Sequence, residues 1–323
     1  MKLASLKSGR DGVLLVVSKD LKSAVRADGI APTMQALLDE WDALSPRAEE
    51  LYAKLNRGAA RNAFALDQTE LAAPLPRTFQ YLDGACYLSH IRRNRMARGE
   101  SLPDDLDAVP LIYQGISYGF GAWNDPITGQ DEADLIDFEA EVAAILGDVP
   151  RHAKAPDASK YIRLFCLLQD TSLRRIVPFE VKRTFGLLVA KPESALGPIA
   201  VTPDELGDLW DGSLVGGRMA VTLRGRQIGN IDTGLGSPFS YGDVIAYCAQ
   251  TRNLAAGTIL GLGTVSNDDD SVGCACIGEY RALETLKTGK PTLDFMKKGD
   301  VVRLELLDRD GVSVMGAIEQ RVD

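Results

Sequence analysis

Most of this chain consists of short apolar segments separated by connections that contain glycine and proline. Beyond residue 76, segments with strand-like apolar content occur at residues 135–146, 161–168, 185–190, 219–223, 227–231, 258–262 and 301–307. Helical patterns are fewer and cover residues 202–209, 241–250 and 278–288. Many strands combined with few helices predict a mixed, strand-rich α+β domain.

The N-terminal residues show a different pattern, which predicts a small α/β domain. Turns with glycine and aspartate separate expected strands at residues 2–7, 12–18 and 23–27. Apolar residues three or four apart then indicate a helix: Met34, Leu37, Leu38, Trp41 and Leu44. Ser45 and Pro46 suit an N-cap and a first helical position, so we expect a second helix to begin there. Residues 72–77, with two prolines, are the expected linker between domains at 1–73 and 74–323.

The composition excludes some classes of partner. The 323 residues include 45 acidic and 36 basic side chains, which give a formal net charge of −9 and disfavour a nucleic-acid partner. No apolar segment has the length of a membrane span and the N-terminus lacks the apolar core of a signal peptide, so we expect a cytoplasmic protein without a membrane partner. The five cysteines are scattered without a CxxC pair, which indicates reduced thiols rather than disulfides or a zinc site.

The sharpest chemical signal is the segment Ile-Asp-Phe-Glu-Ala-Glu-Val at residues 136–142. Alternate side chains of a strand share a face, so Glu139 and Glu141 would point the same way, and Asp137 with them. Neighbouring carboxylates repel each other unless a cation or a proton neutralises them. A solvent-facing polar strand is the alternative, but the apolar residues 142–146 favour a strand that enters the core.

Two further regions offer acidic or imidazole groups. Asp170 follows the apolar segment 161–168, and strand ends open onto clefts, although a turn or cap role is equally compatible with its position. Asp83 precedes His90, one of only two histidines, by seven residues. His152 lies in a polar loop and is expected at the surface. A structural role is the default for a single histidine, so His90 becomes a candidate only if the carboxylates lie nearby.

Carboxylate oxygens suit Mg²⁺, Ca²⁺ or Mn²⁺ rather than zinc, and no histidine–cysteine cluster competes with them. Residues 261–264, Gly-Leu-Gly-Thr, lack the remaining residues of the known phosphate-binding loops. The chain also has no GxSxG motif, which disfavours an α/β-hydrolase. The sequence therefore favours a site for a hard divalent cation.

Taken in order, these motifs resemble the fumarylacetoacetate hydrolase family, including acylpyruvate hydrolases, from about residue 74 to the C-terminus. They are Leu82-Asp83-Gly84 with His90, Tyr113-Gln114-Gly115, residues 137–141, Asp170-Thr171-Ser172-Leu173-Arg174, Phe185-Gly186, residues 201–206 and Gly263-Thr264-Val265-Ser266-Asn267. The N-terminal portion resembles the small strand-rich domain of the longer members. The resemblance implies a mixed β-roll catalytic domain and a homodimer.

The resemblance also implies roles for residues at matching positions. Mg²⁺, Ca²⁺ or Mn²⁺ would be held by Asp83, Glu139, Glu141 and Asp170, with His90 activating water and Glu279 orienting the histidine. The implied substrate-binding residues are Ala85, Arg95, Arg98, Tyr113, Lys182, Arg183 and Thr264. Lys182 and Arg183 are alternatives for one family lysine, and Arg95 and Arg98 are alternatives for one arginine. Val177 stands where fumarylacetoacetate hydrolases have a substrate-binding glutamine, which leaves the substrate open.

The implied activity is metal-dependent hydrolysis of a carbon–carbon bond in a β-diketo or 2,4-dioxo acid, such as fumarylacetoacetate or an acylpyruvate. Such a reaction belongs to the catabolism of aromatic compounds, including tyrosine degradation. Decarboxylation of oxaloacetate and hydration or isomerisation of a 2-oxo-enoic acid are alternatives on the same scaffold. A non-catalytic binding protein is a more remote alternative, because the four carboxylates and the histidine are all retained.

Overall fold

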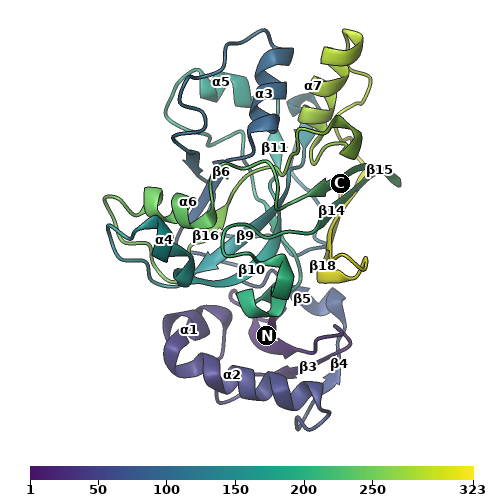
Figure 1. The fold of residues 1–323 in the computed structure, drawn as a ribbon. Helices are drawn as coiled ribbons and strands as arrows, with labels where there is room; N and C mark the ends of the chain where they lie inside the picture. Colours follow the sequence, from purple (N-terminus) through teal and green to yellow (C-terminus); the bar gives the residue numbers. More distant parts are fainter.

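The computed structural model describes residues 1–323 and has a strand-rich α+β fold, which confirms the predicted fold class (Figure 1). The helices are α1 (Met34–Asp39), α2 (Trp41–Asn56), α3 (Leu88–Ala97), α4 (Ala155–Ala158), α5 (Val177–Val181), α6 (Tyr241–Cys248) and α7 (Ile277–Thr288). Five short 3₁₀ helices are η1 (Gln68–Glu70), η2 (Glu132–Asp134), η3 (Ser159–Tyr161), η4 (Pro203–Leu209) and η5 (Asp270–Val272).

The chain has eighteen strands. The first nine are β1 (Lys2–Leu6), β2 (Val13–Val17), β3 (Ser23–Arg26), β4 (Phe64–Ala65), β5 (Leu71–Ala72), β6 (Tyr81–Ala85), β7 (Leu111–Gln114), β8 (Ile136–Asp137) and β9 (Ala140–Leu146). The others are β10 (Ile162–Gln169), β11 (Ser172–Leu173), β12 (Ala195–Leu196), β13 (Ala200–Val201), β14 (Arg218–Leu223), β15 (Arg226–Asp232), β16 (Ile259–Gly261), β17 (Val301–Leu307) and β18 (Ser313–Arg321). The strands β1, β2 and β3 form where the N-terminal pattern predicts them.

The N-terminal helices pack against the strands of the same region, at the bottom of Figure 1. Thr33 caps α1, because its side chain accepts a hydrogen bond of 3.2 Å from the Ala36 N–H. Met34, Leu37 and Leu38 are buried and join an apolar cluster with residues of β1 and β2. The apolar residues that recur every three or four positions in α1 are therefore the residues that this helix buries.

The boundary between the first two helices lies at Glu40, so the predicted break at Ser45 is wrong. Helix α2 begins at Trp41 and contains Pro46. Pro46 is the sixth residue of α2, so it removes the hydrogen bond to the carbonyl of residue 42 and crowds that carbonyl. Ser45 and Ala48 are buried on the inner face of α2, and this packing stabilises one continuous helix.

One twelve-stranded sheet runs through both parts of the chain. Its main order is β4-β3-β2-β1-β13-β10-β9-β16-β6-β7, with β12 and β5 paired to β10 and β1. Strand β1 pairs with β13 and thereby joins the N-terminal strands to the rest of the sheet. The pairs are antiparallel except for β16 with β6. The adjacent strands β10, β9, β16 and β6 form the middle of the sheet, where the acidic residues of interest lie.

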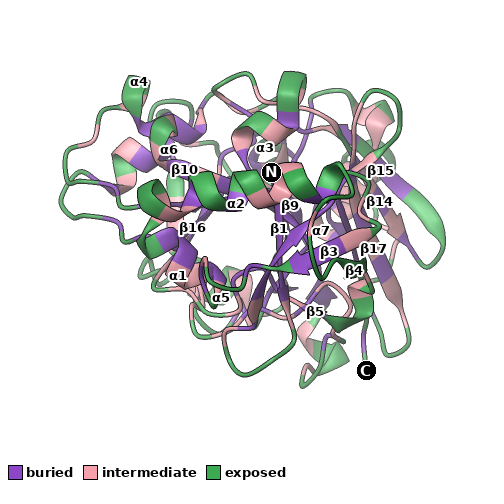
Figure 2. Ribbon diagram, turned by 90° about the horizontal axis from the view of Figure 1, so that it is seen from below, coloured by how far each residue is buried: buried purple, intermediate pink, exposed green.

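A second sheet, β15-β14-β17-β18, covers part of the large core. In β17 every second residue is buried, which places Val302, Leu304 and Leu306 in the largest apolar cluster of the molecule. Figure 2 shows buried strands behind α2, whereas much of α2 itself is exposed. No helix combines the length and the apolar character needed to cross a bilayer.

Two predicted elements differ in the structure. Residues 185–190 form a loop and not a strand, and Gly186 has a φ of 110°, outside the range of extended backbone. The Glu180 carboxylate accepts hydrogen bonds from the N–H groups of residues 188–190, which would otherwise pair in a sheet. Residues 203–209 form 3₁₀ turns with a kink at Gly207 instead of an α-helix.

Candidate active site

Four carboxylates from separate parts of the sequence meet in the middle of the large sheet. Asp83 lies in β6, Glu141 in β9, Glu139 just before β9, and Asp170 just after β10. One oxygen of each lies within 4.8 Å of the others, and all four residues are buried. The sequence analysis selected these four residues, and the pairing of β6, β16, β9 and β10 brings them together.

Gly261 of β16 makes room for two of the carboxylates. Strand β16 lies between β6 and β9, with Gly261 opposite Asp83 on one side and Ala143 on the other. A Cβ atom on Gly261 would overlap with Asp83 Oδ1 and lie 2.7 Å from Glu141 Oε2. Only a glycine at this position leaves the space between the two carboxylates free.

The four carboxylates are not equally neutralised. Lys191 pairs with Asp170 and, at 3.0 Å, with Glu139, whereas Arg174 pairs with Glu139 at 2.7 Å. Burial acts to raise the pKa of Glu139, but the charges of Lys191 and Arg174 outweigh it and hold that pKa below its usual range. Burial, followed by the charge of Asp170, instead raises the pKa of Asp83 to about 8.

Glu141 resembles Asp83, because its pKa is also raised. Burial and the charge of Asp83 raise the pKa of Glu141 well above its usual range. Asp83 Oδ1 and Glu141 Oε1 are buried and have no hydrogen-bond partner. A divalent cation would neutralise the unpaired charges and occupy these free oxygens, so the residues present fit a site for Mg²⁺, Ca²⁺ or Mn²⁺.

Asp137 does not join this cluster, although a continuous strand would have aligned it with Glu139 and Glu141. The strand is interrupted between β8 and β9, and the Asp137 carboxylate turns toward the N-terminus of α7. It accepts hydrogen bonds of 2.8 Å from the N–H groups of Ile277 and Gly278 and one of 2.7 Å from Arg174 Nε. Asp137 therefore ties α7 to the arginine that contacts Glu139.

Lys191 was missed by the sequence analysis, which considered Lys182 and Arg183 for a lysine of the site. Lys182 and Arg183 are exposed, and Arg183 stacks on Phe179 instead of contacting the carboxylates. Lys191 is buried beside Asp170 and Glu139 and lies over the Tyr113 ring at 5.5 Å. Burial acts to lower the pKa of Lys191, but the two carboxylates raise it above its usual range. The available signal in the sequence was the apolar segment 185–190 that precedes Lys191, just as the apolar segment 161–168 precedes Asp170.

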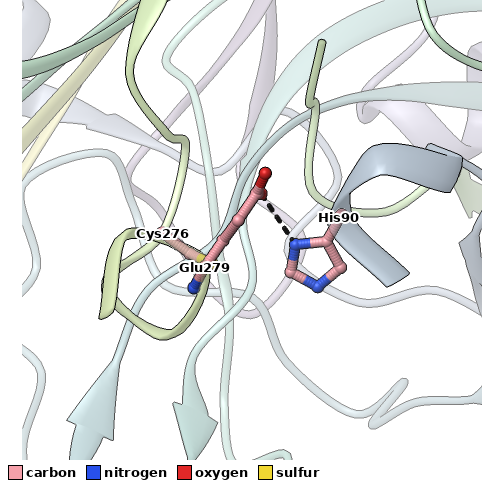
Figure 3. Close-up of side chains that lie close together, drawn as sticks. All are labelled: His90, Cys276 and Glu279. Carbon is pink, nitrogen blue, oxygen red and sulfur yellow. Dashed lines mark hydrogen bonds and ion pairs between the residues drawn. The ribbon is translucent and has the colours of Figure 1, made fainter. Parts of the chain in front are cut away.

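His90 and Glu279 form a hydrogen-bonded pair (Figure 3). His90 lies in the first turn of α3 and Glu279 in the first turn of α7, and His90 Nδ1 is 2.9 Å from Glu279 Oε2. Burial acts to raise the pKa of Glu279, but the hydrogen bond and charge of His90 lower it. Cys276, the N-cap of α7, forms a backbone bridge with Glu139, which places this pair next to the carboxylates.

The other predicted substrate-binding residues divide into two groups. Tyr113 donates a hydrogen bond of 2.8 Å to Asp170 Oδ2, and Thr264 has a buried hydroxyl without a partner. Ala85 ends β6, two residues after Asp83. Arg95 donates to the Ser101 carbonyl and Arg98 pairs with Glu100 at the surface, so neither contacts the carboxylates.

Two family models match the two parts of the chain. A family model described as fumarylacetoacetase N-terminal domain 2 matches residues 1–77, and one described as fumarylacetoacetate (FAA) hydrolase C-terminal matches residues 80–323. The mitochondrial oxaloacetate tautomerase Fahd2a of Rattus norvegicus is 27% identical over 61% of this chain. The aligned region covers 55% of the rat protein, so the chain spans about half the length of this relative.

Two solved structures have the same fold over the whole chain. Maleylpyruvate hydrolase from Sphingobium, in complex with manganese(II) and pyruvate, has a TM-score of 0.65 at 17% identity and covers 100% of this chain and 98% of its own. Fumarylacetoacetate hydrolase from Exiguobacterium antarcticum has a TM-score of 0.63 at 17% identity, with 100% and 99% covered. Because the family model matches most of its length, the chain belongs to the fumarylacetoacetate hydrolase family.

Proposed function

We propose that this protein is a divalent-metal-dependent enzyme that hydrolyses a carbon–carbon bond in a small β-diketo or 2,4-dioxo acid. One observation carries the proposal: two unpaired, buried carboxylate oxygens, on Asp83 and Glu141, lie in a cluster next to the His90–Glu279 pair. A cation site adjoining a histidine–carboxylate pair suits activation of water beside a chelated substrate. Manganese(II) and pyruvate, bound to the Sphingobium relative, support this class of ligand.

Asp83, Glu139, Glu141 and Asp170 would hold the ion. When bound, Mg²⁺, Ca²⁺ or Mn²⁺ would polarise the oxygens of a dicarbonyl substrate and neutralise negative charge that develops on them. Lys191 holds Glu139 and Asp170 in place through its two ion pairs, and its charge helps to keep Glu139 ionised. The Thr264 hydroxyl, which has no partner within the protein, is available to donate a hydrogen bond to the substrate carboxylate.

His90 would act as the general base. If its Nδ1–H donates to Glu279, Nε2 carries the lone pair; the Asn94 amide lies 3.4 Å from Nε2 and must yield to the water whose proton Nε2 accepts. The hydroxide would add to the distal carbonyl carbon, and the adjoining carbon–carbon bond would break. The leaving carbanion would take up a proton, so that an acylpyruvate and water yield a carboxylic acid and pyruvate.

Tautomerisation of a 2-oxo acid is a second candidate, and the name of the rat relative favours it. A tautomerase needs a base that moves a proton between carbon and oxygen, and His90 could serve this reaction without adding water. The two reactions differ in their products, because only hydrolysis breaks the carbon skeleton. Decarboxylation of oxaloacetate differs again, since it releases carbon dioxide.

A substrate panel tests the proposal directly. The protein, loaded with Mg²⁺ or Mn²⁺, is incubated with acylpyruvates, fumarylacetoacetate and oxaloacetate, and products are separated by chromatography. Formation of pyruvate from an acylpyruvate, lost on chelation and restored by metal, is the expected result. If oxaloacetate exchanges between its enol and keto forms and no substrate is cleaved, the activity is tautomerisation and not hydrolysis. No turnover together with tight ligand binding would favour a binding protein.

We also propose a homodimer that takes part in the breakdown of aromatic compounds. The maleylpyruvate hydrolase activity in the name of the Sphingobium relative supports such a pathway. Large apolar side chains exposed near α5, including Phe179, Phe185 and Leu188, support a second copy of the chain as partner. Light scattering after size-exclusion chromatography measures the mass, and a monomer at micromolar concentration would contradict the dimer.

A further inference from the structure

The two oxygens of the Glu279 carboxylate have different partners. Oε2 lies 2.9 Å from His90 Nδ1, whereas Oε1 accepts hydrogen bonds of 2.6 Å from both Arg93 Nη1 and the Ser266 hydroxyl. Glu279 is fully buried, so these contacts determine where its carboxylate can point. His90 and Arg93 lie on the same side of α3, one turn apart, and both contact the one carboxylate of α7.

Arg93 connects three segments of the chain. Besides Glu279, it donates to Ser266 at 3.1 Å, to the Asp268 carbonyl at 3.2 Å and to Asp270 at 2.6 Å. Asp270 in turn pairs with Lys287 of α7. The Arg93 side chain is 8% exposed, in contrast to its neighbour Arg92 at 44%. A buried guanidinium with this many charged partners has a defined geometry and not the freedom of a surface side chain.

Helix α3 has little apolar packing that could replace these polar contacts. Its buried apolar residues, Leu88 and Ile91, form a separate cluster of only three members with Leu106. A further polar contact of α3 is the hydrogen bond of 2.7 Å between Ser89 and Ser266, and Ser266 also contacts Arg93 and Glu279. Figure 1 shows α3 and α7 at the top of the molecule, where they pack together. The position of α3 therefore depends strongly on the contacts of Arg93.

We propose that Arg93 is a positioning residue of the active site. It holds Glu279 by the oxygen that His90 does not use, and it fastens α3 to α7 and to residues 266–270. His90 is thereby kept beside the carboxylate cluster with Nδ1 directed at Glu279. The groups that face Glu279 are His90, Arg93, Ser266 and the buried thiols of Cys274 and Cys276. The catalytic consequence rests on the proposed function, whereas the positioning of the His90 ring does not.

The first test reads the His90 ring without any substrate. The chain has two histidines, and His152 is exposed, so ¹H–¹⁵N spectra of labelled imidazoles distinguish them. The parent protein should show His90 as the Nδ1–H tautomer, and Arg93→Met should show a mixture of tautomers. Arg92→Met is the matched control, because it removes the same charge from the same helix without touching Glu279. An unchanged His90 tautomer in Arg93→Met would overturn the proposal.

The second test measures turnover with the substrate found in the panel. Arg93→Met should lower kcat by roughly 10- to 100-fold with little change in Mn²⁺ affinity, because Arg93 touches none of the four carboxylates. Arg93→Lys, which can reach Glu279 but not Asp270 at once, should recover part of the loss. In a Glu279→Gln background, Arg93→Met should cost much less, because the carboxylate that it orients is gone. Equal losses in both backgrounds, or activity of Arg93→Met within about twofold of the parent, would refute positioning.

The two tests also separate this inference from the proposed function. If no substrate of the panel is turned over, the proposed function fails, and the tautomer of His90 in Arg93→Met still decides the role of Arg93. If Arg93→Met does not fold, Arg93→Gln, which keeps a polar side chain but loses the charge, takes its place in both tests. A parent-like His90 tautomer and parent-like turnover in Arg93→Gln would then overturn positioning.

Discussion

His90 Nδ1 and Glu279 Oε2 lie 2.9 Å apart, although 189 residues separate them in the chain. Both belong to first turns of helices, His90 in α3 and Glu279 in α7. This pairing converts an isolated histidine into a candidate base, since the carboxylate can fix the tautomer of the ring.

Replacing His90 with alanine should abolish catalysis while leaving the cation site intact. The imidazole contributes no oxygen to the cluster, so Mn²⁺ affinity, measured by titration calorimetry, should stay near the parent value. Loss of a general base typically lowers kcat by about 10²- to 10⁴-fold. His152→Ala is the control, because His152 is exposed in a turn. Full activity of His90→Ala would remove His90 from the mechanism.

Gly261→Ala should weaken metal binding. The added methyl group would meet the Asp83 and Glu141 carboxylates, which would have to move apart. A shift of this size spoils the geometry of a cation site, so Mn²⁺ affinity should fall by roughly 10-fold or more. Gly119→Ala is the control, because its new Cβ would meet nothing nearer than 3.6 Å. Unchanged affinity in Gly261→Ala would place the ion elsewhere.

Lys191→Met should destabilise the metal-free protein strongly. It leaves Glu139 and Asp170 buried without their shared cation, and breaking a buried ion pair in this way costs about 3–5 kcal/mol. A bound divalent ion would offset part of this cost, so the rise in melting temperature on adding metal should be larger than in the parent. Lys182→Met, at an exposed lysine, should behave like the parent in both measurements. Equal effects of the two substitutions would contradict the buried role of Lys191.

The metal-free protein should lose stability as the pH rises from about 4 to 8. The pKa of Asp83 is raised to about 8 in the folded chain, so between its ordinary value of about 3.9 and 8 the folded state binds more protons than the unfolded state. The contribution of this group is therefore complete below the lower pKa and lost as the pH passes the upper one. Glu141, whose pKa is also raised, acts in the same direction.

Thermal melting in the presence of a chelator measures this dependence. Asp83→Asn should flatten the pH profile, because the asparagine cannot ionise, and saturating metal should flatten it for the parent. The raised pKa of Asp83 would be contradicted if the metal-free parent became more stable from pH 5 to pH 8, and by the same amount as Asp83→Asn.

The sequence by itself determined which residues could supply the chemistry. The turns that separate the first three strands, the periodicity in α1 and the apolar segment before Asp170 are local patterns. Such patterns survive into the fold because they decide where an element ends and which residues it buries. The motif at residues 137–141 likewise pointed to Glu139 and Glu141, and the order of motifs pointed to the family. None of this depends on how distant segments meet.

Only the tertiary structure decided which of several equivalent charged residues face the site. The sequence offers Arg92, Arg93 and Arg95 in α3 and Arg98 directly after it, yet only Arg93 is buried against Glu279. Lys191 and Asp137 obtained their partners in the same way, from segments far away in the chain. A charged side chain becomes buried where the folded chain provides an opposite charge, and that partner arrives through strand and helix packing that no local pattern specifies.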